Sequence, residues 1–289
     1  MSSTRDIKRR IRSVKSTQQI TRAMKMVSAA KLRKTQSTLQ AVRPFTRRLD
    51  LLLAHIGPSC RHLWLEGHAE EKPVLYLALG ADRGLAGGFN GNLHRFLDET
   101  LAAETRPYAL AAVGGKLREH CRRQGYQLAF EPDSLADEPD FAQARTLAQQ
   151  LSHSFEQGEY GRIILLYSAF RSSLVHDPAL RQFLPIPHEG SQEQLPDREE
   201  DSPFEDYIFE PSPEEVLLAL LPLYAESFIY TALLEAKAAE HGARMTAMAS
   251  ATENADDMIS RLTLSLNRAR QAAITTEISE IVAGAAALV

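Results

Sequence analysis

One glycine-rich segment has the composition of a phosphate-binding loop. Gly84-Leu-Ala-Gly-Gly-Phe-Asn-Gly91 follows an apolar run that predicts a strand and precedes a stretch that predicts a helix. Backbone N–H groups at such a turn can bind phosphate. The spacing is not Gly-x-Gly-x-x-Gly, however, and no Lys followed by Ser or Thr completes a Walker A loop. A tight turn that needs positive φ explains the same glycines, and the sequence favours that explanation.

The other reactive side chains form no recognisable catalytic or metal-binding pattern. The nine histidines are scattered, with no pair at metal-ligand spacing. Asp256-Asp257, Glu277 and Glu280 are predicted to lie on the solvated face of a helix. No local Ser/His/Asp or Cys/His arrangement is present. The sequence therefore predicts no catalytic residue, no cofactor and no metal.

Basic residues are concentrated near the N-terminus. Residues 1–48 contain fourteen Lys and Arg and one acid, Asp6, so this segment carries a formal charge of +13 within a chain of net charge −4. The rest of the chain therefore sums to −17. Such asymmetry predicts that the basic segment faces an acidic partner. Nucleic acid is one candidate, but the segment lacks interleaved aromatic residues and its charges surround the predicted helix.

Few cysteines and the absence of long apolar runs indicate the cellular context. Cys60 and Cys121 have no metal-ligand spacing, and such a low cysteine content is typical of a reducing compartment. No apolar run approaches the roughly 18 residues that span a membrane. The sequence therefore predicts a protein without a membrane segment of its own.

Two long helices are predicted at the ends of the chain. Seam residues recur at alternating spacings of four and three from Ile7 to Ile56 and again over residues 245–273. Such a repeat makes a helix wrap around a partner helix. The N-terminal seam positions are Ile7, Ile11, Val14, Gln18, Thr21, Lys25, Ser28, Leu32, Thr35, Leu39, Val42, Thr46, Leu49, Leu53 and Ile56. The ends are predicted to pair as an antiparallel coiled coil, with residues 14–32 beside residues 245–266.

The middle of the chain has the alternating pattern of an α/β domain. The predicted strands and helices alternate along the sequence, which favours a small sheet covered by helices. The predicted strands are 74–79, 108–113, 126–130 and 162–170, and the predicted helices are 90–104, 115–124 and 142–156. Gly57-Pro58 predicts the end of the first long helix. Ser212-Pro-Glu-Glu215 predicts the start of the last one.

Three blocks of the sequence resemble the γ subunit of rotary F-type ATP synthases. The first runs from Ile11 to Arg33, the second from Asp82 to Asn90, and the third from Glu240 to Leu288. Ala86 stands where the family often has Cys, and Leu266 where it often has Tyr. The regulatory cysteine segment of the chloroplast form is absent, so the chain resembles the bacterial type.

The resemblance implies the fold class α/β plus a long antiparallel α-helical coiled coil. A central Rossmann-like α/β domain would be inserted between the N- and C-terminal helices. The implied segments are an N-terminal coiled-coil helix over 1–57, the α/β domain over 73–190, a loop and foot segment over 191–211, and a C-terminal coiled-coil helix over 212–289.

The resemblance also implies a non-catalytic rotor subunit of the central stalk. In the family, the paired helices turn as a shaft inside a hexamer of α and β subunits. The α/β domain is the foot, which sits on the membrane ring of c subunits beside ε. Rotation couples ion flow through the ring to ATP synthesis or hydrolysis on the hexamer. The implied location is the cytoplasmic face of the bacterial cell membrane, reached only through the complex, with no nucleic-acid partner.

Individual residues are matched to these interfaces by the resemblance. The shaft positions that would contact β, at its acidic lever or its catch loop, are Arg22, Met24, Lys25, Arg270 and Gln271. The foot positions that would contact ε and the c ring are Tyr207, Phe209 and Glu210. The positions in the apolar bearing at the top are Ala285 and Leu288. Polar seam residues such as Gln18 would keep the shaft contacts weak and reversible.

Two other classes of protein each explain one feature. A nucleotide-binding α/β enzyme with an oligomerising coiled coil would explain the glycine-rich segment. A nucleic-acid-binding coiled coil would explain the basic N-terminal helix, and its binding would be sensitive to salt. Both leave the third block unexplained.

Overall fold

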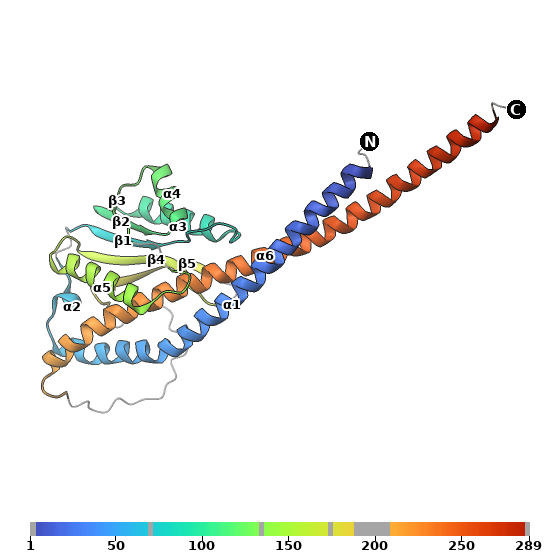
Figure 1. Ribbon diagram of the computed structural model, residues 1–289. Coiled ribbons are helices and arrows are strands. Elements are labelled where there is room, and N and C mark those ends of the chain that lie inside the picture. Colours follow the sequence, from blue (N-terminus) through green and yellow to red (C-terminus); the bar gives the residue numbers. More distant parts are fainter. Residues whose placement is uncertain (1–3, 69–71, 133–135, 173–175, 188–208, 287–289) are drawn as a thin grey trace. The chain divides into compact units, whose positions relative to one another are not determined.

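A computed structural model describes residues 4–68, 72–132, 136–172, 176–187 and 209–286 (Figure 1). The chain divides into two compact units. The helix-pair unit comprises residues 1–28 and 244–289, and the sheet unit comprises residues 29–243. Two long helices, α1 and α6, contribute to both units.

The two long helices have the ends that the sequence predicts. α1 spans Thr4–Ile56 and α6 spans Pro213–Ala286. The backbone N–H of Glu215 donates a hydrogen bond to Oγ of Ser212 at 3.3 Å. A Ser N-cap followed by Pro at the first helical position is a favourable start for a helix, which explains where α6 begins.

In the helix-pair unit, α1 and α6 run side by side and antiparallel. A buried hydrogen bond of 2.9 Å joins the hydroxyls of Thr21 and Thr252. The side-chain amide of Gln18 donates to the carboxylate of Asp256. Residue numbers fall along α1 as they rise along α6, so the helices are antiparallel, and this prediction is confirmed. Asp256, predicted to be only solvated, also contacts the neighbouring helix.

The seam of the helix pair follows the predicted repeat except at Lys25 and at Ala273, which is exposed. The buried positions of this unit include Ile7, Thr21, Ser28, Met248, Thr252 and Ala255. Lys25 is exposed, and Met24 is half-buried in its place. Desolvating an ammonium group costs far more than desolvating a thioether, and the two positions are neighbours on the helix surface. The prediction that Lys25 lies in the seam is therefore wrong.

A five-stranded mixed sheet forms the centre of the sheet unit. Its strands are β1 (Val74–Leu79), β2 (Tyr108–Val113), β3 (Leu128–Phe130), β4 (Arg162–Phe170) and β5 (His176–Leu184). Their order is β3-β2-β1-β4-β5; the first four are parallel, and β5 is antiparallel to β4. Every residue of β1 is buried, as expected for a central parallel strand that is covered on both faces.

Helices cover both faces of this sheet (Figure 1). α3 (Phe89–Ala103) and α4 (Gly115–Gln124) pack on one face, where Leu93, Leu97 and Leu117 are fully buried. α5 (Phe141–Glu156) packs on the other face. The beginning of α6 and the end of α1 join the same core as α5, so both long helices are rooted in the sheet unit by apolar contacts.

Two short elements were not predicted. α2 (Leu63–Glu66) and a single 3₁₀ turn, Gly57–Ser59, lie between the end of α1 and β1, where no element was predicted. Trp64 of α2 is buried, so this stretch contributes to the core. β5 was also missed, because Pro178 and several charged residues interrupt its apolar pattern. Such residues are tolerated on an edge strand.

One helix passes a test of length and composition for a membrane span. Residues Pro213–Ala283 of α6 include an 18-residue window with a mean hydropathy of 1.7 and at most two charged side chains. No such stretch was predicted, because only uninterrupted apolar runs were considered and Glu226 interrupts this run. By length and composition, that prediction is wrong. Since 61% of the window is buried inside the protein, burial in the core accounts for its apolar composition.

Candidate functional site: the paired terminal helices

The predicted β-contact residues form two separate groups on the helix-pair unit. Arg22 and Lys25 are exposed within one turn of α1, beside the half-buried Met24. Arg270 and Gln271 are exposed on α6. Eighteen residues of helix, about 27 Å, separate Arg270 from the position where α6 pairs with Thr21. The structure thus leaves both groups on the outer surface of the helix pair and does not bring them together.

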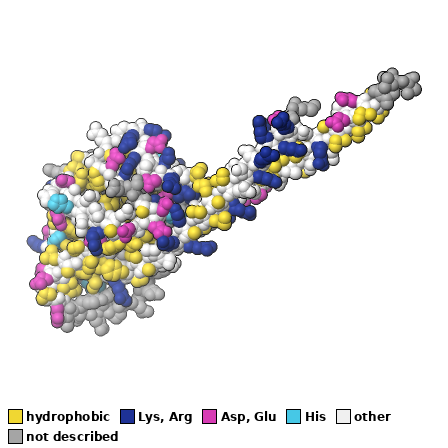
Figure 2. Space-filling view, viewed as in Figure 1, with side chains coloured by type: hydrophobic (Ala, Val, Ile, Leu, Met, Phe, Trp, Pro, Cys, Tyr) yellow, Lys and Arg dark blue, Asp and Glu magenta, His cyan; other side chains and the backbone are white. Residues whose placement is uncertain are grey.

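The last turns of α6 extend beyond the first described residue of α1. The pairing of Thr21 with Thr252 places Thr4 opposite residue 269, so residues 270–286 have no described partner helix. Four large apolar side chains are exposed there at helical spacing: Ile274 47%, Ile278 56%, Ile281 71% and Val282 61%. Figure 2 shows hydrophobic side chains along this end of the helix. A continuous exposed apolar stripe of this kind marks a surface that binds another protein.

Positive charge surrounds the beginning of α1. Lys8, Arg10, Arg12 and Lys15 are exposed, and Figure 2 shows Lys and Arg gathered over this segment. Clustered cations attract acidic partners and speed their association. The described part of the chain therefore offers a basic surface on α1 and an apolar end on α6.

The remaining interface positions lie at the edges of the described residues. Phe209 is half-buried and packs against the core of the sheet unit, whereas Glu210 is exposed. Tyr207 and Leu288 lie outside the described residues. Ala285 belongs to the last turn of α6, but its side chain is not described.

The glycine-rich segment is a turn, and the residues just before it accept hydrogen bonds from backbone N–H groups at the start of a helix. A carboxylate oxygen of Asp82 accepts a hydrogen bond from the N–H of Gly115 at 2.9 Å. The carbonyl of Ala81 accepts one from the N–H of Lys116 at 3.0 Å. These bonds occupy the first N–H groups of the neighbouring helix α4. The first N–H of α3, the helix that follows the segment, donates to the carbonyl of Ala86 at 3.2 Å. Leu85 and Gly87 have positive φ angles of 62° and 58°, as a tight turn requires.

The described residues contain no group of three or more His, Cys, Asp or Glu side chains that could hold a metal ion. A strongly perturbed acid lies instead near the end of α1. Burial raises the pKa of Asp50 on α1 to about 6, although the positive charge of Arg181 on β5 opposes this change. Arg181 also lies over the ring of Phe228, 4.7 Å from its centroid. Tyr167 donates a hydrogen bond of 2.8 Å to Glu235 beside it.

This buried polar group is structural, and sequence reasoning missed it. Its members come from α1, β4, β5 and α6, and no local motif connects residues so distant in the chain. Tyr224 of α6 also lies near Asp50, and its pKa is raised by burial and by the carboxylate. The group joins both long helices to the sheet within the sheet unit.

Replacing Asp50 by Asn is expected to stabilise the protein only at neutral and higher pH. The pKa of Asp50 in the folded state is about 6, above the value of about 3.9 for an unfolded Asp. Burial therefore favours the protonated form, and folding stability is lost as pH rises from about 4 to about 6. Asp50→Asn should raise the free energy of unfolding by about 1–3 kcal/mol at pH 7.5 and change it little at pH 4.

Urea unfolding of the full chain at both pH values measures this difference. Asp257→Asn, on the exposed surface of α6, is the matched control. An equal increase in the free energy of unfolding at pH 4 and pH 7.5 would contradict the raised pKa of Asp50.

These features define a class of protein. A long antiparallel helix pair with exposed basic and apolar surfaces, and an α/β domain inserted between the two helices in the sequence, is typical of a subunit of a larger assembly. A family model described as ATP synthase matches residues 3–288. The chain is 50% identical over 292 residues to the ATP synthase gamma chain of Moorella thermoacetica and 46% identical over 291 residues to that of Desulforamulus reducens. Each alignment covers 100% of both chains.

Solved structures show the same fold at lower identity. A chain of the Euglena gracilis mitochondrial ATP synthase, in a structure of OSCP, F1 and the c-ring, matches with a TM-score of 0.67 and 17% identity. That match covers 99% of this chain and 94% of that chain. A chain from the central stalk and c-ring of the Tetrahymena thermophila mitochondrial ATP synthase matches with a TM-score of 0.59 and 22% identity, covering 80% and 99%.

The chain belongs to the ATP synthase gamma chain family. The predicted family and fold class are thereby confirmed. As a family member, the chain is a subunit of the membrane-associated ATP synthase complex.

Proposed function

We propose that this chain is a non-catalytic rotor, whose turning couples ion flow through a membrane ring to ATP synthesis or hydrolysis on a hexamer of α and β subunits. The observation that carries the proposal is the end of α6, where residues 274–282 expose an apolar stripe beyond the described end of α1. An isolated apolar helix end of this length needs a surrounding partner. A hexamer with a central opening would enclose it.

Two partner surfaces follow from this proposal. The exposed cations Arg22 and Lys25 would meet an acidic surface of β. Arg270 and Gln271 would form hydrogen bonds with a loop of β further along the shaft. The α/β domain, with Glu210 at its edge, would rest on the c ring beside ε, at the cytoplasmic face of the bacterial membrane. The side chains of residues 285–288 would sit in an apolar bearing.

The polar seam suits such a rotor. Thr21 and Thr252 share a hydrogen bond where a dedicated coiled coil would bury Leu or Ile. Each net hydrogen bond contributes only about 0.5–1.5 kcal/mol. Weak, reversible contacts of this kind would leave no single angle of the shaft strongly favoured within the hexamer.

The isolated chain is expected not to bind or hydrolyse ATP. The first N–H of α3, the helix after the glycine-rich segment, donates to the carbonyl of Ala86, and the sequence has no Walker A loop. Titration calorimetry of the lone chain with Mg-ATP should give no heat of binding. Micromolar affinity would overturn this expectation and favour a nucleotide-binding enzyme.

Reconstitution with α and β subunits tests the proposed function directly. The α and β subunits are assembled with this chain, the hexamer is fixed to a surface, and a gold particle is attached to the α/β domain. Addition of Mg-ATP should produce rotation of the particle in one direction. Steady ATP hydrolysis by the assembled complex without rotation of the particle would contradict a rotor function.

A further inference from the structure

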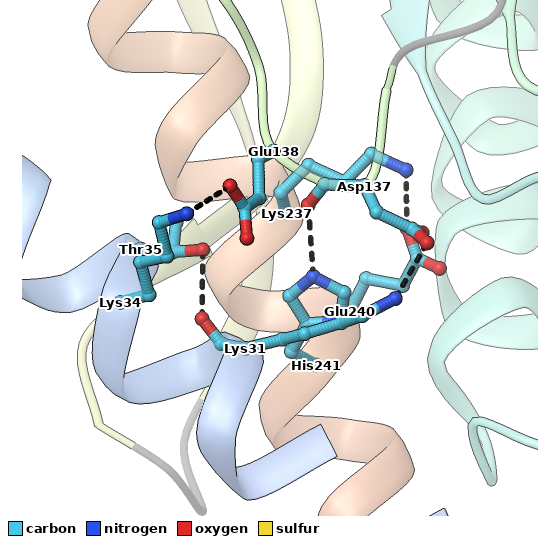
Figure 3. A network of polar contacts seen from close by, with 8 residues as sticks. All are labelled: Lys31, Lys34, Thr35, Asp137, Glu138, Lys237, Glu240 and His241. Atoms are coloured by element: carbon cyan, nitrogen blue, oxygen red, sulfur yellow. Dashed lines mark hydrogen bonds and ion pairs between the residues drawn. The ribbon is translucent and has the colours of Figure 1, made fainter. Parts of the chain in front are cut away.

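A polar network in the sheet unit joins both long helices to the loop that precedes α5 (Figure 3). On α1, Nζ of Lys31 lies 2.5 Å from a carboxylate oxygen of Asp137. One turn further, Lys34 forms an ion pair with Glu138. On α6, Nε2 of His241 donates a hydrogen bond of 3.1 Å to the backbone carbonyl of Asp137. A single loop residue therefore contacts both long helices.

The centre of this network is a buried ion pair. Nζ of Lys237 and a carboxylate oxygen of Glu240, one turn apart on α6, are separated by 3.0 Å. Their side chains are only 3% and 5% exposed. The positive charges of Lys31 and Lys237 both lower the pKa of Asp137, with the hydrogen bond from Lys31 as the largest cause. The buried pair and the loop therefore belong to one electrostatic group.

The charges in the network are balanced. Three lysines (Lys31, Lys34 and Lys237) face three carboxylates (Asp137, Glu138 and Glu240). Ions that have left water are tolerated only when their partners stay in place, so a buried ion pair contributes little net stability but penalises any other arrangement strongly. Hydrogen bonds also require particular distances and angles.

The apolar core beside the network attracts the helices without favouring one orientation. α5, the beginning of α6 and the end of α1 share that core with the sheet. Hydrophobic contacts contribute most of the attraction, but they are not directional. Helices held only by such contacts can roll or slide with little loss of buried area. The network therefore adds directional restraints between these segments of the long helices and the loop before α5, beside the hydrogen bond from Tyr167 to Glu235.

We propose that this network is an angular lock, which fixes the rotational setting of the long helices relative to the α/β domain. Lys31, Asp137, Lys237, Glu240 and His241 are its positioning residues. The inference rests on the proposed rotor function: in a rotor, the angle imposed on the α/β domain reaches the hexamer only as accurately as the two parts are held together. The lock determines how closely the angle of the long helices follows the angle of the α/β domain. It does not change the rate of ATP hydrolysis.

The first test removes the buried pair without leaving an unpaired charge. Lys237→Met with Glu240→Leu keeps the volume and replaces ions by apolar groups, a change that is often neutral or stabilising. The thermal midpoint of the complex should stay equal or rise. The variance of the particle's angle at the catalytic pauses should rise about twofold, because Lys237 of α6 no longer attracts Asp137 of the loop. ATP hydrolysis should remain at the parental rate.

The second test uses the accessible pair and a charge swap. Lys31→Glu places two negative charges together and should broaden the pause angles, and Asp137→Lys should do the same. The double variant Lys31→Glu with Asp137→Lys restores an ion pair and should return the angles to the parental width. Lys116→Glu, which breaks an ion pair with Glu119 on α4, is the matched control and should leave the width unchanged.

The outcomes separate the lock from the rotor. If parental complexes do not rotate, the proposed function fails. If they rotate and the variants that assemble keep the parental angular width, the lock is wrong and the apolar core alone transmits the angle. If the buried-pair variant does not assemble, the Lys31 and Asp137 variants decide, and a swap that does not restore the width also overturns the lock.

Discussion

Replacing Arg270 and Gln271 together by Ala is expected to lower ATP synthesis by the assembled complex more than tenfold, while α6 keeps its helical structure. Both side chains are exposed on α6, and Ala is the best helix former, so the helix should persist. Hydrogen bonds that involve a charged group contribute about 1.5–3 kcal/mol each. Their loss at a rate-limiting angle would change a rate by about tenfold or more.

The location of these two residues makes them sensitive. α6 loses its described partner helix near residue 270, so a contact with β there acts on one helix and not on a braced pair. A guanidinium group offers several donors in a planar arrangement, which suits a loop carrying carboxylates. The strength of this contact would therefore depend on the angle of the shaft.

Arg268→Ala is the matched control for this prediction. Arg268 is also exposed, but it points about 200° around the helix from Arg270. ATP synthesis in reconstituted vesicles, with the amount of assembled complex measured in parallel, gives the comparison. A double variant that assembles normally and synthesises ATP at the parental rate would mean that other shaft contacts carry the torque.

The fold was largely predictable where one local signal dominates. β1, β2 and β4 have the predicted ends because continuous apolar runs end at Pro, Gly or polar residues. The long helices were predictable because their repeat persists over many turns, and polar seam positions such as Thr21 are buried as expected. The antiparallel pairing followed from two repeats of the same spacing at opposite ends of the chain.

The sequence did not predict features that depend on distant residues. Asp50 and Arg181 are more than a hundred positions apart, and nothing in either neighbourhood indicates that they share a buried site. Lys31 looks like any surface lysine until the loop at Asp137 is placed beside it. α2 has only four residues, which is too short for a periodic signal.

The β-contact residues illustrate what the resemblance adds. Exposure alone does not distinguish Arg270 from Arg268, since both are solvated cations on α6. Their separation into contact and non-contact residues comes from the family match and stays a prediction. Met24 is the intermediate case: its half-buried side chain divides its contacts between the partner helix and the outside.

Replacing Gly114 by Ala is expected to destabilise the sheet unit by about 3–5 kcal/mol, because overpacking adds to an unfavourable backbone conformation. Gly114 has a φ of 101°, and a Cβ atom there would lie 2.4 Å from the carbonyl oxygen of Gly80. Backbone atoms at both positions are fixed by the parallel pairing of β1 with β2. The neighbouring chain therefore cannot move aside.

Gly125→Ala separates the two causes of this effect. Gly125 also has a positive φ, 78°, but no atom lies within 4 Å of its added Cβ. It should cost only about 1 kcal/mol, the penalty of a left-handed backbone for Ala. Urea unfolding of both full-chain variants measures the difference. Equal losses would mean that backbone conformation alone requires glycine at position 114. A larger loss at Gly114, in a chain that still shows no heat with Mg-ATP, would mean that close packing of β1 against the start of α4 requires this glycine without any bound phosphate.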